Sequence, residues 1–336
     1  MENGEENGLP QYQVELEAIG QGIRDFEEGK GENIALISEP FAGRSKLINE
    51  IRKIYADKIT SIRFNTTITS NEFLSSLREG KDIVIVENCH FLARRKIGGF
   101  DQIDAFLTYM SSSHQLFITS WNTFSWSYLS AVMSVNSFFP RVVRLYPLGA
   151  EALKTLILSS YPYAIRFSED VEHAADRISV SMACLHIRLP FSSTVHCIPW
   201  PEIRLPQLLK GRRKIKAEDA FFDRLASISG GNPGVARKLF EQALTFPEIP
   251  LSALKEPKYI ISLGVNDRFL LSLILTMELV SKEDLAEIAG PDIDTDKSLY
   301  LLSAAGLVTG EEGTYAIAHE ALKSVVQYLE LSRVVW

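Results

Sequence analysis

The chain has 336 residues, 46% hydrophobic and 23% charged, so it is long enough for two or three domains with their own cores and is not intrinsically disordered. Its 35 Lys and Arg and 42 Asp and Glu give a net charge of −7, which excludes a uniformly basic surface for nucleic acid or anionic lipid. Three cysteines are too few for a disulfide framework, and no apolar run is long enough to span a membrane. Residues 1–12 form a polar leader without a signal-peptide pattern, so we expect a cytoplasmic protein.

Predicted helices and strands alternate along residues 13–150. A first helix is expected over residues 13–26, where apolar residues recur near helical spacing. Short β-rich runs follow at 33–38, 61–64, 82–86, 115–119 and 141–146, with helix-like stretches between them at 46–55, 70–78, 100–112 and 125–135. This alternation indicates an α/β domain with a parallel sheet and helices on both faces.

The rest of the chain divides into two further predicted units. Residues 151–255 are mainly helical and are interrupted at 179–206 by a segment rich in β-branched residues and proline, for which an inserted hairpin is one interpretation. Residues 256–336 contain three predicted helices, then a strand, a glycine-containing turn and a strand over 307–317, and a closing helix. This is the element order of a winged-helix domain.

Residues 38–46 have the context of a phosphate-binding loop, because they follow a strand and open a helix. The pattern G-x-x-x-x-G-K-[ST] is matched at Gly43 and Ser45, but Ser38 replaces the first glycine and Arg44 replaces the lysine. Arginine keeps the charge but is a wider, planar group. An ordinary strand-to-helix turn is the alternative. The candidate nucleotide-binding residues are Ser38, Glu39, Pro40, Phe41, Ala42, Gly43, Arg44, Ser45 and Lys46.

A second motif ends the apolar strand at 82–86. An active ATPase of this type needs an Asp that holds Mg²⁺ and then a Glu that activates water. The chain has Glu87 and Asn88 at these places. Glu87 could hold Mg²⁺ together with Ser45, or simply cap the following loop, whereas the amide of Asn88 cannot act as a base.

Two polar residues complete the pattern. Asn122 follows the fourth predicted strand, and Arg237 lies in the sequence GNPGVAR at the start of a helix. With these motifs the chain, from residue 13 to its C-terminus apart from 179–206, resembles AAA+ ATPases near the origin-recognition and STAND branches. The resemblance implies a P-loop NTPase sheet of order 5-1-4-3-2, a helical lid, a C-terminal winged helix, and ATP or ADP with Mg²⁺. It also implies that Asn122 and Arg237 are the two sensor residues and that Arg141 is an arginine finger for a neighbouring subunit.

The replaced residues leave open whether the protein is an enzyme. Loss of the general base and of the loop lysine favours slow or absent hydrolysis with residual nucleotide binding. We therefore expect a nucleotide-dependent switch or scaffold in a protein complex. The alternatives are an active origin-recognition-like ATPase that binds duplex DNA, and a structural subunit with an empty site.

The charge of the predicted winged helix bears on its partner. Residues 281–320 contain two basic and nine acidic residues, a net charge of −7. Because such a surface is poorly suited to DNA phosphates, a protein partner or a second copy of the chain, bound through the winged helix or the AAA+ interface, is favoured over DNA. Basic runs at 94–96 and 210–216 are the remaining candidates for nucleic acid.

Overall fold

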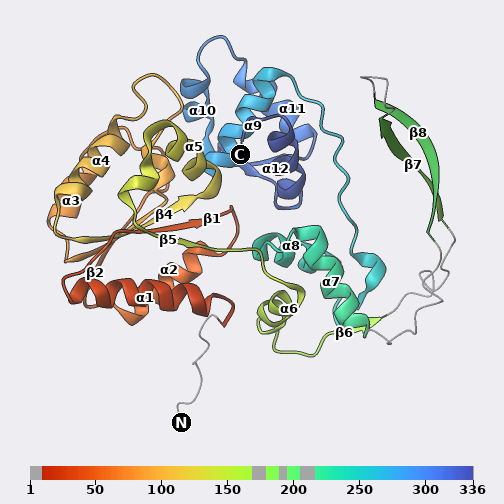
Figure 1. The fold of residues 1–336 in the computed structure, drawn as a ribbon, viewed down its shortest axis with the longest axis horizontal. Helices are drawn as coiled ribbons and strands as arrows, with labels where there is room; N and C mark the ends of the chain where they lie inside the picture. Colours follow the sequence, from red (N-terminus) through yellow and green to blue (C-terminus); the bar gives the residue numbers. More distant parts are fainter. Residues whose placement is uncertain (1–9, 169–178, 189–194, 205–215, 336) are drawn as a thin grey trace.

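A five-stranded parallel sheet forms the centre of the first part of the chain (Figure 1). The computed structural model describes residues 10–168, 179–188, 195–204 and 216–335. The strands are β1 (Ile34–Ser38), β2 (Ile59–Arg63), β3 (Ile83–Glu87), β4 (Leu116–Asn122) and β5 (Arg141–Arg144). Their order is β2-β3-β4-β1-β5, and every neighbouring pair is parallel. This is the predicted order 5-1-4-3-2 read from the other edge, so the predicted fold class is confirmed.

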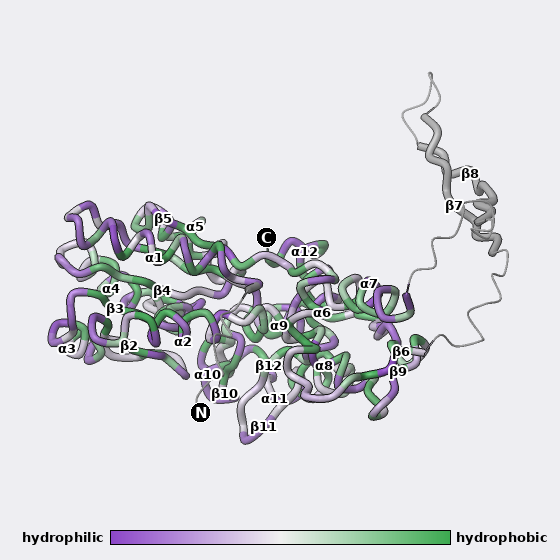
Figure 2. The backbone as a smooth tube through the Cα atoms, turned by 90° about the horizontal axis from the view of Figure 1, so that it is seen from below, coloured by the Kyte–Doolittle hydropathy of each residue, from purple (hydrophilic) through white to green (hydrophobic). Residues whose placement is uncertain are grey.

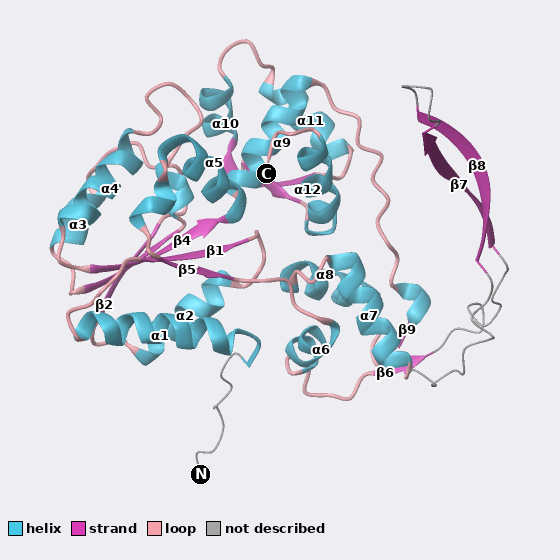
Figure 3. Cartoon of the chain, viewed as in Figure 1, coloured by secondary structure: helices cyan, strands magenta, loops and turns pink. Residues whose placement is uncertain are grey.

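Helices cover both faces of the sheet (Figure 3). One face carries α1 (Gln13–Glu27) and α2 (Arg44–Ile54), and the other carries α3 (Phe73–Arg78), α4 (Asp101–Ser112) and α5 (Thr123–Met133). Along β1, Ile34 and Leu36 join the core beneath α1 and α2, while Ala35 and Ile37 join the core on the opposite face. Since successive strand residues point to opposite faces, a strand buried on both sides must be apolar throughout.

A group of helices follows the sheet. It comprises α6 (Ala150–Leu158), α7 (Ala217–Ser229) and α8 (Pro233–Ala243). Two short strands, β6 (Arg166–Ser168) and β9 (Glu248–Pro250), pair in parallel. The longer strands β7 (Ser179–Arg188) and β8 (Val195–Arg204) pair antiparallel, in agreement with the hairpin interpretation of the insertion.

The last part of the described chain, residues 265–335, is called the C-terminal region below. Its helices are α9 (Val265–Met277), α10 (Lys282–Ala289), α11 (Thr295–Ala304) and α12 (Leu322–Leu331). Its strands, β10 (Val280–Ser281), β11 (Val308–Glu311) and β12 (Thr314–Ile317), form an antiparallel sheet of order β10-β12-β11. Ser281 caps α10: its Oγ accepts a hydrogen bond from the N–H of Asp284 at 3.0 Å.

The C-terminal region packs directly against the sheet domain. The core on the α4 and α5 face of the sheet continues into α7, α8, α9 and α12 as one buried cluster. Along α1, hydrophilic and hydrophobic segments alternate, as expected for a helix with one buried face (Figure 2). Among the helices of the described residues, none is long and apolar enough to cross a membrane.

Candidate functional site

The loop between β1 and α2, residues 39–43, requires a glycine at its end. Gly43 is the N-cap residue of α2 and has a left-handed φ of 90°. A Cβ atom at Gly43 would lie 2.7 Å from the Oη of Tyr12. Tyr12 donates a hydrogen bond from this Oη to the carbonyl oxygen of Ala42. Conformation and space therefore both demand glycine at this position.

The first turn of α2 offers backbone donors to an anion. Among the described residues, no side chain caps this helix. The N–H of Lys46 donates to the carbonyl oxygen of Gly43 at 3.0 Å, which leaves the N–H groups of Arg44 and Ser45 for an anion. Ser45 and Lys46, in the same turn, are exposed. Because the helix dipole adds partial positive charge, this turn has the properties of a phosphate site.

Two cations lie near this turn. Partial loss of hydration around its ammonium, together with the charge of nearby Arg237 on α8, lowers the pKa of Lys46. Arg237 donates from Nη2 to Ser160 Oγ at 3.0 Å. Within the part of the chain that the structure describes, neither cation forms an ion pair. An anion bound between the two would relieve the repulsion between their charges.

Helix α8 holds the loop from one side. Asn232, the N-cap residue of α8, donates from Nδ2 to the carbonyl oxygen of Pro40 at 2.8 Å. The N–H of Gly234 donates to the carbonyl oxygen of Phe41 at 3.1 Å. In the same loop, burial raises the pKa of Glu39, against the lowering effect of a hydrogen bond with Asn232. The helical region and the loop are therefore in direct contact.

A cavity of about 170 Å³ lies between the loop, the end of β5 and the start of α8. Ser38, Glu39, Tyr146 and Asn232 are among the residues that line it. Ligand pockets typically measure about 300–1,000 Å³. The cavity could therefore hold part of a nucleotide in this arrangement, but not a whole one.

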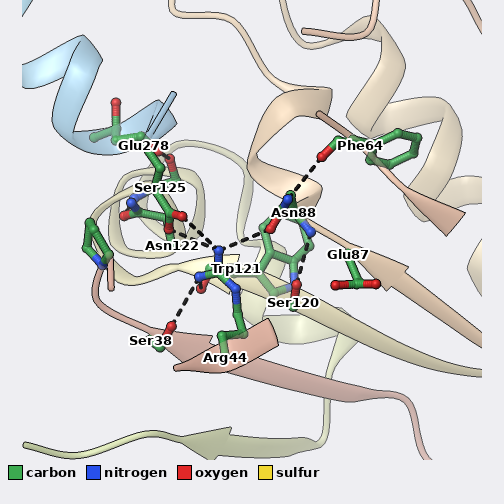
Figure 4. Close-up of polar contacts among 12 residues, drawn as sticks. Ser38, Arg44, Phe64, Glu87, Asn88, Ser120, Trp121, Asn122, Ser125 and Glu278 are labelled. Atoms are coloured by element: carbon green, nitrogen blue, oxygen red, sulfur yellow. Dashed lines mark hydrogen bonds and ion pairs between the residues drawn. The ribbon is translucent and has the colours of Figure 1, made fainter. Parts of the chain in front are cut away.

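Arg44, in the lysine position of the loop motif, points toward the carboxyl edge of the sheet (Figure 4). Its side chain is 8% exposed. Nη1 donates to Ser38 Oγ at 3.1 Å and to the carbonyl oxygen of Trp121 at 3.0 Å. Nη2 donates to Asn88 Oδ1 at 3.1 Å and to both carboxylate oxygens of Glu278 at 3.0 Å. The guanidinium thus joins the ends of β1, β3 and β4 to the C-terminal region.

Glu278, the partner of Arg44, directly follows α9 and has a left-handed φ of 64°. With its ψ of −51° and the hydrogen bond of 2.7 Å from the N–H of Leu279 to the carbonyl oxygen of Met277, the residue forms a γ-turn, a strained conformation that costs a non-glycine residue about 1–3 kcal/mol. Burial raises the pKa of Glu278, but the charges of Arg44 and His90 and hydrogen bonds with Arg44 and Asn122 outweigh it and hold the pKa below its usual value. The carboxylate therefore remains ionised beside Arg44.

Asn122 and Ser125 add neutral contacts to the same interface. Asn122 is fully buried and caps α5 by accepting a hydrogen bond from the N–H of Phe124 at 2.8 Å. Its Nδ2 donates to the carbonyl oxygen of Leu275 at 2.9 Å, and Ser125 Oγ donates to that of Thr276 at 2.7 Å. The last carbonyls of a helix lack donors within that helix, so these two side chains satisfy the end of α9.

Asn88 and Glu87 have separate surroundings. The backbone N–H of Asn88 donates to Ser120 Oγ at 2.9 Å, and its Nδ2 donates to the carbonyl oxygen of Phe64 at 3.0 Å. Its remaining oxygen accepts from Arg44. Glu87 lies apart from this cluster (Figure 4).

Glu87 is balanced by two arginines. The carboxylate is 1% exposed, and its oxygens lie 2.9 Å from Arg52 Nη2 and 2.8 Å from Arg63 Nη2. Within the described ranges, no three His, Cys, Asp or Glu side chains converge as a metal site. A Mg²⁺ ion at Glu87 would have to displace an arginine, so the arrangement does not fit Mg²⁺-dependent hydrolysis. The start of α2 does fit a chain of phosphates.

The predicted basic run at 94–96 is used inside the molecule. Arg94 Nη1 lies 2.9 Å from Glu287 Oε1 on α10, and Lys96 pairs with the same carboxylate. The guanidinium carbon of Arg95 lies 3.9 Å from the centre of the Tyr128 ring. Arg94 and Lys96 therefore bind the C-terminal region, whereas Arg95 packs on α5. Of the second basic run, only Lys216 lies within the described residues.

Arg141, the candidate arginine finger, contacts its own chain. It lies on β5 and donates from Nη2 to Asp25 Oδ2 on α1 at 2.6 Å. Of the predicted site residues, the structure brings together Ser38, Arg44, Asn88 and Asn122, and places Glu87 and Arg141 elsewhere.

The sequence predicted none of the residues with which the C-terminal region contacts the site. Besides Glu278 and Glu287, Asp284 accepts a hydrogen bond from Thr67 Oγ1 at 3.0 Å, and His319 stacks on Phe41 with ring centres 3.9 Å apart. Each contact joins distant parts of the chain, and no short motif marks it. The local sequence offered one signal of these contacts, namely that Glu278, and not a glycine, follows the last residue of α9.

No family model and no curated protein matches the chain. Among solved structures, a point mutant of RuvB from Thermotoga maritima is 13% identical, with 94% of each chain covered and a TM-score of 0.44. Cdc6p from Pyrobaculum aerophilum is 12% identical, with 98% of this chain and 96% of that chain covered and a TM-score of 0.42. The ADP form of Aeropyrum pernix ORC2 is 11% identical, with 98% and 97% covered and a TM-score of 0.42. All three are AAA+ ATPases, the family that the sequence resembles. Because these TM-scores reflect only a loose overlap, functional conclusions rest on this chain's own residues.

Proposed function

We propose that this chain is a nucleotide-responsive switch or scaffold of the AAA+ type, which binds ATP or ADP and does not hydrolyse ATP. The contact between Arg44 and Glu278 carries the proposal. It links the candidate phosphate site to the C-terminal region and so supports a switch. The lack of hydrolysis is supported by Glu87, which is paired with Arg52 and Arg63 and is not free to hold Mg²⁺. The amide of Asn88 adds a second reason, because it cannot accept a proton from the attacking water.

Nucleotide phosphates bind, in this proposal, at the start of α2. Support comes from the uncapped first turn, from exposed Ser45 and Lys46, and from Arg237 on the facing helix. Each supplies a hydrogen-bond donor or positive charge toward an anion. The adjoining cavity would have to widen to admit the nucleoside, so nucleotide binding would move the helical region relative to the loop.

The partner is proposed to be a protein. We infer three units, residues 13–150, 151–255 and 256–336, of which the last is a winged helix. Its acidic surface supports contact with another protein or a second copy of the chain, and the few cysteines support action in the cytoplasm. A DNA-binding ATPase has less support, because Arg94 and Lys96 are paired with Glu287.

The proposal is tested by titrating ATP and ADP into the purified chain, with and without Mg²⁺, and by measuring phosphate release. The double variant Arg44→Lys/Asn88→Glu restores the expected catalytic residues. Arg24→Lys/Asn71→Glu makes the same chemical changes at exposed positions and is the control.

We expect all three proteins to bind nucleotide, and the wild type and the control to release no phosphate. Phosphate release by the double variant alone would assign the loss of hydrolysis to Arg44 and Asn88, and its absence would assign it to the two arginines on Glu87. Multiple turnovers by the wild type would contradict the proposal. A failure of all three proteins to bind ATP or ADP would also contradict it.

A further inference from the structure

The carboxylate of Glu278 lies against Arg44 as two phosphate oxygens would. Both of its oxygens are 3.0 Å from Arg44 Nη2. Arginine binds carboxylates and phosphates with the same planar set of donors, so one anion can replace the other. A phosphate chain bound at the start of α2 would have Arg44, the first residue of that helix, within its reach.

We propose that Glu278 is an internal ligand of Arg44, and that a polyphosphate chain competes with it and thereby releases the C-terminal region. This inference rests on the proposed function, because the competing anion is the phosphate chain of the nucleotide. It assigns the regulation of that site to a residue outside the sheet domain.

The backbone of Glu278 supports this role. The residue ends α9 with a φ of 64°, a conformation that glycine adopts without strain. Both oxygens of its carboxylate accept hydrogen bonds of 3.0 Å from Arg44. A glycine at this position would avoid the strain but would have no carboxylate. The strain is therefore accounted for if the anion is what this position requires.

The other contacts of the interface are of a different kind. Asn122 and Ser125 donate neutral hydrogen bonds to the end of α9, and Glu287 is 47% exposed in its pair with Arg94. By contrast, the side chains of Arg44 and Glu278 are only 8% and 23% exposed.

Displacement of Glu278 from Arg44 therefore has a large consequence. A mostly buried carboxylate that has lost its paired cation raises the free energy of the folded state strongly. Glu278 must then turn toward solvent, and the end of α9 must move with it. The two equilibria are linked: phosphate binding weakens the docking of the C-terminal region, and docking of this region weakens phosphate binding by the same factor.

The test is calorimetric titration of sodium tripolyphosphate, without Mg²⁺, into the full-length wild type and three variants. Glu278→Gln removes the charge and keeps the size of the side chain. Glu278→Gly removes the side chain and suits the positive φ, and, like Glu278→Gln, it leaves Arg44 without its carboxylate. Glu283→Gln removes one charge from an exposed position on α10 and is the control.

We expect both Glu278 variants to bind tripolyphosphate at least tenfold more tightly than the wild type, and the control to bind like the wild type. Equal affinity in all four proteins would overturn the inference. An equal gain in the control would also overturn it, since net charge alone would then explain the change.

Parallel titrations with ATP and ADP separate this inference from the proposed function. If the Glu278 variants gain tripolyphosphate affinity but no protein binds a nucleotide, competition at Arg44 is supported and the nucleotide function fails. If all four proteins bind ATP equally well, the nucleotide function stands and the competition is wrong.

Discussion

Two buried asparagines join neighbouring parts of the molecule to the carboxyl edge of the sheet. Asn232 caps α8 and donates a hydrogen bond to Pro40, and Asn122 caps α5 and donates one to Leu275. Both amides cross an interface at 2.8–2.9 Å. Of these two interfaces, and among the described residues, only that with α9 adds a charged link, between Arg44 and Glu278.

This difference indicates which interface can respond to a ligand. An amide that is hydrogen-bonded to a carbonyl group does not attract anions. An arginine that is paired with a carboxylate does, because a phosphate can take the place of the carboxylate. Phosphate alone is therefore expected to open the α9 interface and to leave the α8 interface in place, whereas widening the cavity beside α8 needs the nucleoside as well.

The largest expected effect comes from breaking the charged link. We expect Arg44→Ala to lower the free energy of unfolding by about 3 kcal/mol, because Glu278 loses its cation in a mostly buried position. Arg237→Ala, on the α8 side, removes a hydrogen bond to an exposed serine and is expected to change it by less than about 0.5 kcal/mol. Urea unfolding at neutral pH measures both. Similar effects of the two substitutions would contradict the contrast between the interfaces.

A second prediction concerns pH at the α9 interface. Burial lowers the pKa of His90 from 6.5 to about 4, with Glu278 acting to raise it and Arg44 to lower it. The unfolded chain therefore takes up a proton as the pH falls through 6.5, and the folded chain does so only near 4. The stability contributed by neutral His90 is present above pH 6.5 and is lost below it, by about 2 kcal/mol between pH 7 and pH 5.

The His90 prediction is checked by urea unfolding across this pH range. His90→Gln is expected to remove this part of the pH dependence, and His114→Gln, at an exposed position, to leave it unchanged. The prediction fails if the His90 variant keeps the pH profile of the wild type.

The effects expected from the two asparagines are smaller than those of Arg44 and His90. Asn122→Ala and Asn232→Ala each remove a helix cap and a buried hydrogen bond, so each should lower the free energy of unfolding by about 1.5 kcal/mol. Asn71→Ala, at an exposed position, is the control. A much larger loss of stability at one asparagine would show that the two neutral hydrogen-bonded contacts are not equivalent.

Much of the fold was predictable because its signals are local. The apolar run of β3, the alternation of strands and helices, and the glycine before α2 each lie within a few residues. The predicted fourth strand was too short, since β4 continues through Ser120 to Asn122. These polar residues interrupt the apolar pattern but are buried with hydrogen-bond partners.

The chemistry of the candidate site was not predictable from the same signals. Arg44 and Glu278 are 234 positions apart, and no periodic pattern connects them. Arg63 reaches Glu87 because the register of β2 and β3 places them side by side. Strand register and the docking of distant regions depend on the packing of the whole molecule, so a motif such as the loop before α2 shows where a site lies but not what its side chains bind.

The central claim, that phosphate and the C-terminal region compete for Arg44, is tested most directly by hydrogen exchange on the wild type with and without saturating tripolyphosphate. The account predicts faster exchange in residues 270–289, which end α9 and form α10, and no acceleration in α8. Unchanged or slower exchange in residues 270–289, with the ligand shown to be bound, would contradict it.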